Sequence, residues 1–235
     1  MLSIIIPTLN EEDFLPNSLA SIKKQNIGDH EIIVADAGSK DSTLDIAKKY
    51  GCRIIAGGLP AKGRNNGAKA AKGDLLFFLD ADTILPDDFF EKSMQEFNAR
   101  NLDIASFCLR SFPENKISFF FENFIYNKII ILLENILPHS AVGILVKKGL
   151  FDKLGGYDET ITLAEDMDLS RRAAFYGKFG IIRAKEILVS DRRFRRDGLV
   201  AIGIKFFLCE LHMIFIGPVR SNIFNYRFNH YKDKK

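Results

Sequence analysis

The chain has few of the residues that build disulfide scaffolds or histidine metal sites. Only three cysteines occur among its 235 residues, and none forms a Cys-x-x-Cys pair. The four histidines are scattered along the sequence. This pattern argues against a disulfide framework and against a zinc site, and it is typical of a protein in a reducing compartment.

The sequence also lacks a recognisable signal peptide and a good membrane-spanning segment. Met1 leads directly into a short apolar run with no basic segment before it. The most apolar stretch, 201–219, contains Lys205, Glu210 and His212, which makes it a poor spanning helix. We therefore expect a cytoplasmic protein, with the cytoplasmic face of the membrane as the alternative location.

Two nucleotide-binding fingerprints are missing as well. Gly58 and Gly63 have the spacing of a phosphate-binding P-loop, but Arg64 and Asn65 stand where Lys and Ser or Thr are needed. No Gly-x-Gly-x-x-Gly pattern follows either of the first two apolar runs. These absences exclude a P-loop hydrolase and an NAD enzyme. We still expect Arg64 at the start of a helix, where a phosphate would be stabilised.

Charge is distributed unevenly, although the formal net charge is only +3. Residues 185–235 hold 11 Lys and Arg against 5 Asp and Glu, whereas residues 1–184 hold 22 against 25. Basic charge beside the apolar run 201–219 favours contact with an anionic membrane, and a core helix with a solvated basic end is the alternative. The apolar segment 117–137 has a polar face of Asn123, Asn127 and Glu134, which indicates either an interfacial helix or a core or dimer helix.

Apolar runs alternate with helical segments along the chain. Strands are expected at 2–6, 31–36, 53–57, 75–79, 102–109, 141–148, 179–183 and 187–190. Helices are expected to begin at the cap Asn10, to end near Tyr50, and to cover 65–73, 86–100, 117–137 and 162–177. This alternation predicts βαβ units and a mostly parallel sheet in an α/β fold, whose ligands bind at the carboxyl ends of the strands.

Two carboxylates follow the apolar run 75–79 directly. Asp80 and Asp82 are two residues apart, so in an extended chain they point to the same face. Hard oxygen ligands in small number suit Mg²⁺ or Mn²⁺ shared with the phosphates of a substrate. A solvated turn is the alternative, and the position after a buried strand favours the metal site.

Two further clusters carry charge that could do chemistry. Glu165, Asp166 and Asp168 begin an expected helix, where they either compensate the helix dipole or supply a general base. Four arginines lie within 192–196, where they either bind phosphate or form a solvated basic loop. No recognition helix or RNA-binding motif accompanies them, so we expect no nucleic-acid partner.

Taken in order, these pieces resemble the family 2 glycosyltransferases of the GT-A fold. The resemblance rests on SIIIPTLNEE, EIIVADAGSKDST, KGRNNGAKAAKGDLLFFLDADT, GLFDKLGGYDE and AEDMDLSRRA, and it covers residues 2–197. It implies a Rossmann-like, mostly parallel sheet flanked by helices, with C-terminal amphipathic helices. The expected organisation is a domain at 1–197, with a nucleotide-binding half at 1–110 and an acceptor half at 111–197. Residues 198–235 would form a basic and apolar helical extension.

The resemblance also implies roles for individual residues. Asp36 would bind the nucleobase, although Ala35 stands where family members commonly have a first acidic residue. Asp166 would be the catalytic base, with Glu165 beside it. Asp82 would hold Mg²⁺ or Mn²⁺, and Asp80 would contact the metal or the ribose. The remaining residues expected around the nucleotide and its phosphates are Pro7, Thr8, Glu12, Arg64, Arg193 and Arg196.

The implied reaction moves a sugar from a UDP-, GDP- or dTDP-sugar to an acceptor hydroxyl or lipid phosphate, with inversion at the anomeric carbon. A lipid-linked or glycan acceptor in envelope synthesis, peripheral contact with an anionic membrane, and a homodimer are the implied partners. The alternative from another class is a nucleotidyltransferase that makes nucleotide sugars. Such an enzyme would usually have a Gly-rich signature with Arg and Lys after the first strand, where this chain has PTLNEE. A catalytically inactive binding module is a third interpretation, which the intact acidic residues disfavour.

Overall fold

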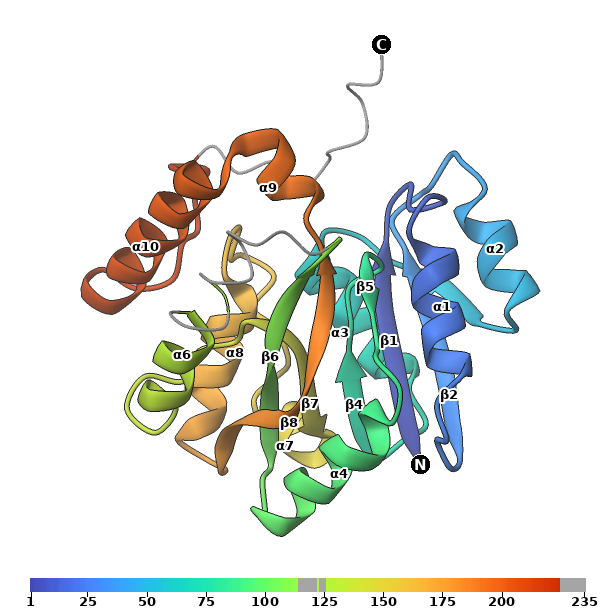
Figure 1. The fold of residues 1–235 in the computed structure, drawn as a ribbon, viewed down its shortest axis with the longest axis horizontal. Helices are drawn as coiled ribbons and strands as arrows, with labels where there is room; N and C mark the ends of the chain where they lie inside the picture. The colour runs from blue at the N-terminus through green and yellow to red at the C-terminus, as the bar shows by residue number, and fades with distance from the viewer. Residues whose placement is uncertain (114–121, 123–125, 225–235) are drawn as a thin grey trace.

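The computed structural model describes residues 1–113, 122 and 126–224, which form one mixed sheet flanked by helices (Figure 1). The strands are β1 Leu2–Thr8, β2 His30–Asp36, β3 Arg53–Ala56, β4 Leu75–Phe78, β5 Thr83–Ile84, β6 Ile104–Phe112, β7 Val142–Lys147 and β8 Phe179–Ser190. The helices are α1 Leu15–Lys23, α2 Thr43–Lys49, α3 Pro60–Ala70, α4 Phe89–Ala99, α6 Asn127–Leu133, α7 Lys148–Lys153, α8 Glu165–Ala174, α9 Arg192–Asp197 and α10 Leu199–Phe215.

Within the described residues the sheet has the strand order β3-β2-β1-β4-β7-β6-β8-β5. Strands β3, β2, β1 and β4 are parallel to one another, and so are β6 and β8. Strand β7 is antiparallel to both of its neighbours, and the short β5 is antiparallel to β8. The predicted α/β fold with a mostly parallel sheet is therefore confirmed.

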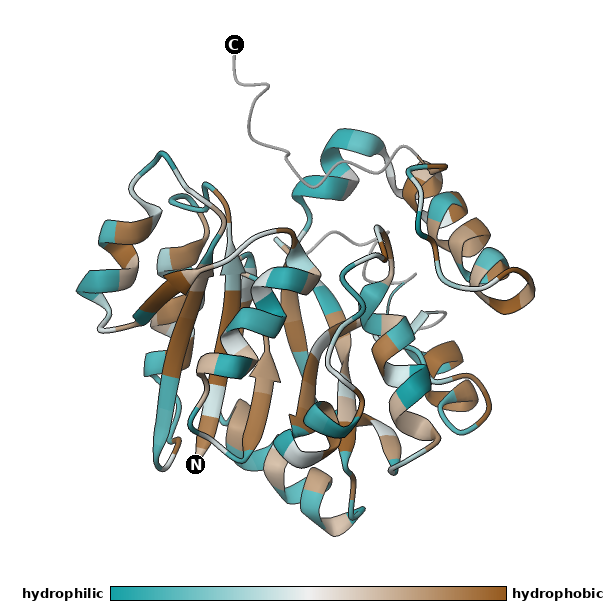
Figure 2. Cartoon of the chain, turned by 180° about the vertical axis from the view of Figure 1, so that it is seen from behind, coloured by the Kyte–Doolittle hydropathy of each residue, from teal (hydrophilic) through white to brown (hydrophobic). Residues whose placement is uncertain are grey.

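The core lies on both faces of the sheet, which explains why its strands are apolar without alternation. In β1, Ile4 and Ile6 pack on one face against α1 and α4, whereas Ile5 packs on the other face against α3. Phe77 of β4 lies within 6 Å of the rings of Phe89, Phe90 and Phe107. Figure 2 shows mostly apolar central strands flanked by helices in which polar and apolar residues alternate. The continuous apolar runs thus identify the central strands correctly.

The first half of the chain departs from the expectations at two helix starts. Asn10 does not cap α1, which begins at Leu15; Asn10 has a left-handed backbone with φ of 55°. Its side-chain oxygen instead accepts a hydrogen bond of 2.8 Å from the amide of Lys40, which joins the loops after β1 and β2. Helix α3 begins at Pro60, so Arg64 lies inside the helix and the expectation of Arg64 at a helix start is wrong.

The second half departs in two further places. The predicted strands 179–183 and 187–190 are one strand, β8. The residues between them form an irregularity in its pairing with β6, and the pairing continues on both sides of it. The arginine cluster at 192–196 is helical (α9) and not a loop. Of the expected helix 117–137, residues 117–121 and 123–125, including Asn123, lie outside the described residues, and α6 covers Asn127–Leu133.

Two polar side chains of this segment point into the protein, whereas several of its apolar ones point outward. Asn127 exchanges two hydrogen bonds with the backbone of Leu109, and Glu134 binds Arg100 and Arg183. Both polar side chains are buried, while Ile129, Leu132 and Ile136 are exposed. Helix α6 therefore presents an apolar surface to its surroundings, on the same side of the molecule as α10 (Figure 1, Figure 2).

Candidate functional site

The acidic residues singled out in the sequence gather at one edge of the sheet. Strands β1, β2 and β4 are parallel, so Thr8, Asp36 and the turn of Asp80 and Asp82 all lie at their carboxyl ends. The first turn of α8, with Glu165 and Asp166, approaches the same edge through ion pairs to Arg64 on α3. The candidate site is thus assembled from segments more than 150 residues apart.

Arg64 is the centre of this site. Its side chain is only 6% exposed, and its guanidinium lies 2.6 Å from a Glu165 oxygen, 2.8 Å from an Asp80 oxygen and 3.5 Å from an Asp166 oxygen. These carboxylates raise the pKa of Arg64 well above its ordinary value, against the opposing effect of burial. The guanidinium also lies over the ring of Tyr157, at 5.4 Å from its centroid. Arg64 therefore holds three predicted site residues in one arrangement.

Asp166 combines a charged neighbourhood with partial access to solvent. Burial raises its pKa to about 7, Glu165 and Asp80 contribute by repulsion, and Arg64 opposes them. The side chain remains 33% exposed. The position is set by Ala164, which caps α8 in a left-handed conformation with φ of 64°, a geometry that costs energy for a residue other than Gly. Asp166 can thus exchange a proton near neutral pH.

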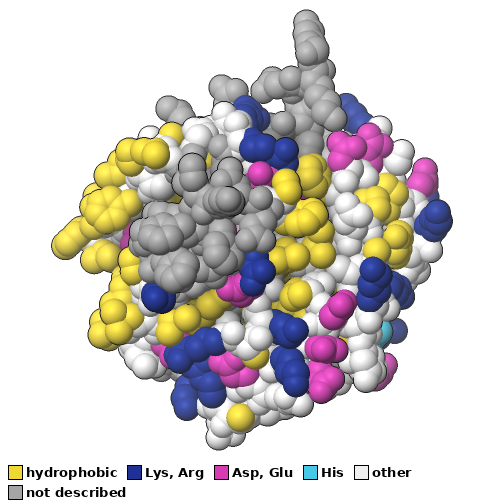
Figure 3. Space-filling view, viewed as in Figure 1, with side chains coloured by type: hydrophobic (Ala, Val, Ile, Leu, Met, Phe, Trp, Pro, Cys, Tyr) yellow, Lys and Arg dark blue, Asp and Glu magenta, His cyan; other side chains and the backbone are white. Residues whose placement is uncertain are grey.

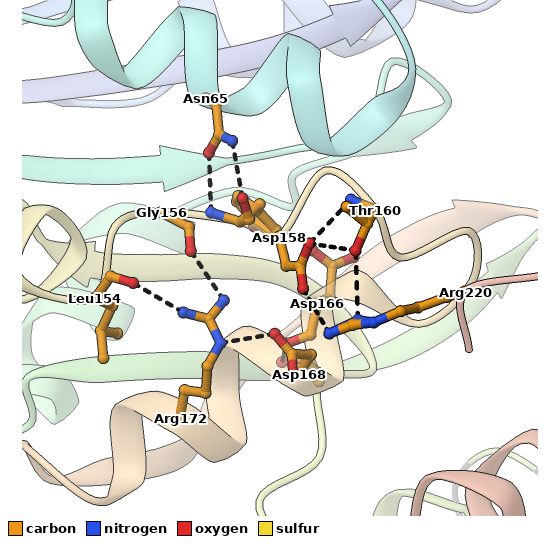
Figure 4. Close-up of polar contacts among 11 residues, drawn as sticks. Asn65, Leu154, Gly156, Asp158, Thr160, Asp166, Asp168, Arg172 and Arg220 are labelled. Atoms are coloured by element: carbon orange, nitrogen blue, oxygen red, sulfur yellow. Dashed lines mark hydrogen bonds and ion pairs between the residues drawn. The ribbon is translucent and has the colours of Figure 1, made fainter. Parts of the chain in front are cut away.

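The loop between α7 and α8 is fixed by residues on either side of it (Figure 4). Asn65, next to Arg64 on α3, donates to the Tyr157 carbonyl and accepts from the Tyr157 amide, both at 2.9 Å. Arg172 binds the carbonyls of Leu154 and Gly156 and pairs with Asp168 at 2.7 Å. Asp168 therefore holds this loop in place rather than joining Asp166 in the site.

At the opposite side of the site, Asp82 pairs with an arginine. The Nε atom of Arg192, at the start of α9, lies 3.0 Å from an Asp82 oxygen. The same guanidinium contacts both oxygens of Glu11, at 3.1 and 3.3 Å, and lies 4.3 Å above the ring of Phe14. Sequence reasoning missed Glu11 and Phe14 and gave Arg192 no individual role, because contacts between residues about 180 positions apart leave no local signal.

Asp36 is placed at the carboxyl end of β2, as expected for a nucleotide site. Its two oxygens accept hydrogen bonds from the hydroxyl of Thr8 at 3.0 Å, the hydroxyl of Ser39 at 2.5 Å, and the amides of Gly38 and Ser39 at 2.8 and 2.9 Å. Four donors match the acceptor capacity of one carboxylate. In this conformation Asp36 organises the loop at the end of β2.

The other residues expected near the nucleotide lie at varying depth. Pro7 is in β1, where it faces Gly63 of α3: a methyl group added to Gly63 would lie 3.3 Å from Pro7. Glu12 is exposed and accepts a hydrogen bond from the amide of Ser42 at 3.0 Å. On α9, the charge of Arg193 opposes the burial that raises the pKa of Asp82, whereas Arg196 lies 3.6 Å from Asp197.

Asp80 and Asp82 have the chemistry of a divalent-cation site. Both are carboxylates, and burial raises the pKa of Asp82, with Asp80 adding to the rise and Arg192 and Arg193 opposing it. Burial, Asp82 and Asp80 likewise raise the pKa of Glu11 to about 8. Among the described residues, no three His, Cys, Asp or Glu side chains form a metal cage. The two aspartates would suit Mg²⁺ or Mn²⁺ that takes its other ligands from substrate and water.

An open sheet of this order with acidic side chains at its parallel strand ends is the architecture of the GT-A glycosyltransferases. The structure is similar to the mannosyltransferase PcManGT from Pyrobaculum calidifontis, solved in complex with GDP-Man and Mn²⁺. The TM-score is 0.69 at 18% identity, with 89% of this chain and 62% of that chain covered. The chain belongs to Glycosyl transferase family 2, whose sequence pattern matches residues 3–153.

Two curated relatives agree with this family. The chain is 29% identical over 191 residues to the O-antigen chain rhamnosyltransferase RfbN of Salmonella typhimurium, covering 73% of this chain and 60% of that protein. It is 31% identical over 192 residues to the PGL/p-HBAD biosynthesis glycosyltransferase Rv2957 of Mycobacterium tuberculosis, covering 73% of this chain and 69% of that protein. In the part of the chain that the structure describes, no helix combines the length and apolar composition needed to cross a membrane.

Proposed function

We propose that the chain transfers a sugar from a nucleoside-diphosphate sugar to an acceptor, with Asp166 as the catalytic base. The observation that carries this proposal is the buried Arg64, which brings Asp80, Glu165 and Asp166 to the strand ends where a ligand binds in an open α/β sheet. Family membership and the names of the two curated relatives support it.

The donor would lie with its nucleotide along the ends of β1 and β2 and its diphosphate at Asp80 and Asp82. Thr8 and the loop organised by Asp36 would line the nucleotide site. Arg192, Arg193 and Arg196 of α9 would face the phosphates. A bound Mg²⁺ or Mn²⁺ would act as a Lewis acid that neutralises the charge developing on the leaving diphosphate. The complex of PcManGT with GDP-Man and Mn²⁺ supports this choice of ligands.

The proton transfer follows from the position of Asp166. Its carboxylate would remove the proton from an acceptor hydroxyl while that oxygen forms a bond to the anomeric carbon. The bond from the same carbon to the diphosphate oxygen breaks, so a single displacement inverts the configuration. If the acceptor is already an anionic phosphate, no base is needed and Asp166 would orient it.

An envelope glycan or a lipid-linked sugar is the proposed acceptor. The support is chemical and indirect: the relatives are named for O-antigen chain and PGL/p-HBAD synthesis, and α10 has an apolar outer face. That face consists of exposed residues about one helical turn apart. They are Val200, Ile204, Phe207, Leu208 and Phe215.

We further propose that this face of α10 rests on an anionic membrane surface. Figure 3 shows hydrophobic side chains gathered over α10 and α6. The excess of basic residues in 185–235 gives the adjoining segment a charge complementary to acidic lipids. The proposed location is therefore the cytoplasmic face of a membrane, with peripheral attachment.

The transfer proposal is tested by a thermal-shift screen of UDP-, GDP- and dTDP-sugars with Mn²⁺, followed by assays of Asp166→Asn. A donor that binds the native state raises the melting temperature. Asp166→Asn is expected to keep that shift and to lose transfer to a hydroxyl acceptor. Unchanged turnover in this variant would refute the base assignment, and release of pyrophosphate from a nucleoside triphosphate and sugar phosphate would indicate a nucleotidyltransferase instead.

The membrane proposal is tested by flotation with anionic liposomes at low salt. The parent protein and Phe175→Ser, an exposed position at the end of α8, are expected to float. The double variant Phe207→Ser, Phe215→Ser is expected to remain at the bottom. Failure of the parent to float refutes the proposal. If sedimentation instead shows that the parent and Phe175→Ser are dimers and the double variant is a monomer, this face binds a second copy of the chain.

A further inference from the structure

Arg192 occupies the position beside Asp82 where a cation is needed. Its guanidinium bridges Asp82 and Glu11, and all three side chains are at most 20% exposed. The ring of Phe14 covers one face of the guanidinium. An ion pair shielded in this way is stronger than one at the surface, because water and salt screen it less.

The contact conflicts with the proposed metal role of Asp82, on which this inference rests. The Asp82 oxygen that contacts Arg192 at 3.0 Å has one lone pair engaged by the arginine, and a divalent ion bound to the same carboxylate would repel the guanidinium. Arg192 and the metal should therefore weaken each other's contact with Asp82.

The backbone just before Arg192 is held by hydrogen bonds that do not involve its side chain. Just before α9, the amide of Ser190 donates to the Asp82 carbonyl at 3.1 Å, and Val189 pairs with Thr83. The amide of Asp191 donates to the carbonyl of Phe112 at 3.0 Å. These bonds keep the start of α9 beside the metal site whether or not the guanidinium contacts Asp82.

We propose that Arg192 is an internal counter-ion that competes with the divalent cation for Asp82. Without donor, the guanidinium holds Asp82 and Glu11 together and offsets part of their negative charge. When the metal and the diphosphate bind, Arg192 leaves Asp82, and the incoming diphosphate is the anion within its reach. The site therefore binds free metal weakly and binds it well only together with a diphosphate, since each ligand shifts the same equilibrium of Arg192.

The competition is tested by Mn²⁺ titration with the free-ion electron paramagnetic resonance signal, first with metal alone and then with UDP. Arg192→Gln is expected to bind metal alone about tenfold more tightly than the parent, which is within the usual range of site-to-site coupling. Arg192→Lys keeps the charge but cannot form the same planar bridge, so its affinity should fall between the two. Arg195 lies on the same helix and pairs with Asp191. Arg195→Gln should therefore bind the metal with the same affinity as the parent.

Equal or weaker metal binding by Arg192→Gln overturns the proposal. An affinity of Arg192→Lys equal to that of the parent, with only Arg192→Gln tighter, also overturns it, because long-range charge would then explain the effect. If the parent binds Mn²⁺ with UDP and the variants do not differ from it, only the competition fails. If neither the parent nor any variant binds Mn²⁺ with or without UDP, the metal role of Asp82 fails along with it.

Discussion

Arg64 lies within hydrogen-bond distance of both Asp80 and Glu165, although Glu165 is 101 positions further along the chain. One buried guanidinium therefore connects the end of β4 with the first turn of α8. The carboxylates would repel one another without it, so the shape of the site depends on this single side chain.

Replacement of Arg64 by Met should destabilise the fold and disperse the site. Removal of one partner from a buried ionic cluster leaves charges unpaired, which costs about 3–5 kcal/mol. Denaturant unfolding of Arg64→Met measures this loss in the free energy of unfolding. Arg53→Met is the control. The exposed Arg53 lies 3.8 Å from Glu31 and donates to the Ala70 carbonyl at 2.7 Å, so its loss should cost about 1 kcal/mol. Similar losses in both variants would contradict a special role for Arg64.

The rate of transfer should depend on pH through Asp166. Its raised pKa of about 7 means that the base form is lost as the pH falls through 7. Below that value kcat/KM should fall about tenfold for each pH unit, as for a single required deprotonated group. A profile that stays flat down to pH 5 with a hydroxyl acceptor would show that Asp166 is not the base.

Asn65 should matter more than its neighbour Asn66. Asn65 makes two hydrogen bonds to the backbone of Tyr157 in a buried setting, so Asn65→Ala leaves backbone groups without partners at a cost of about 1–3 kcal/mol each. Asn66 is less buried and donates to the carbonyl of Ala56 at 3.0 Å. Chemical denaturation of the two alanine variants compares them. If Asn65→Ala loses no more free energy of unfolding than Asn66→Ala, the special role of Asn65 in holding the loop before α8 is refuted.

Gly67 keeps α3 close to the sheet. A methyl group there would lie 2.3 Å from Cγ2 of Ile5 in β1, so Gly67→Ala should force the helix outward at a cost of about 1–3 kcal/mol. Gly149 in α7 has no atom within 4 Å of the added methyl, and Gly149→Ala should instead stabilise by about 0.5–1 kcal/mol. Thermal melts of both variants give the comparison, and a stabilised Gly67→Ala would refute the close packing of α3.

The sequence predicts the fold and half of the site because those features depend on local chemistry. Ile4, Ile5 and Ile6 are buried on alternating faces, so a continuous apolar run marks the strand. Asp80 and Asp82 are visible because ionised side chains directly after such a run need a partner. Strand β8 could not be predicted as one strand, because three charged residues within 183–186 interrupt its apolar pattern. Pairing with β6 continues on both sides of this interruption.

The missed features depend on tertiary structure. Asn is a favoured residue at helix caps, but the side chain of Asn10 binds the loop after β2. Asn also tolerates the left-handed backbone that Asn10 adopts. Glu11 and Arg192 meet only because β8 runs beside the turn that follows β4. Composition identifies these charged clusters, but it does not single out Glu11 and Arg192 as the members that pair.

The most direct test of the metal site is calorimetric titration of the parent protein and Asp82→Asn with the donor that gives the largest thermal shift. Each protein is titrated with and without Mn²⁺. Donor binding to the parent should depend on Mn²⁺, and Asp82→Asn should lose that dependence. Equal affinity of the parent with and without the metal would contradict the proposal that a divalent ion joins Asp82 to the donor diphosphate.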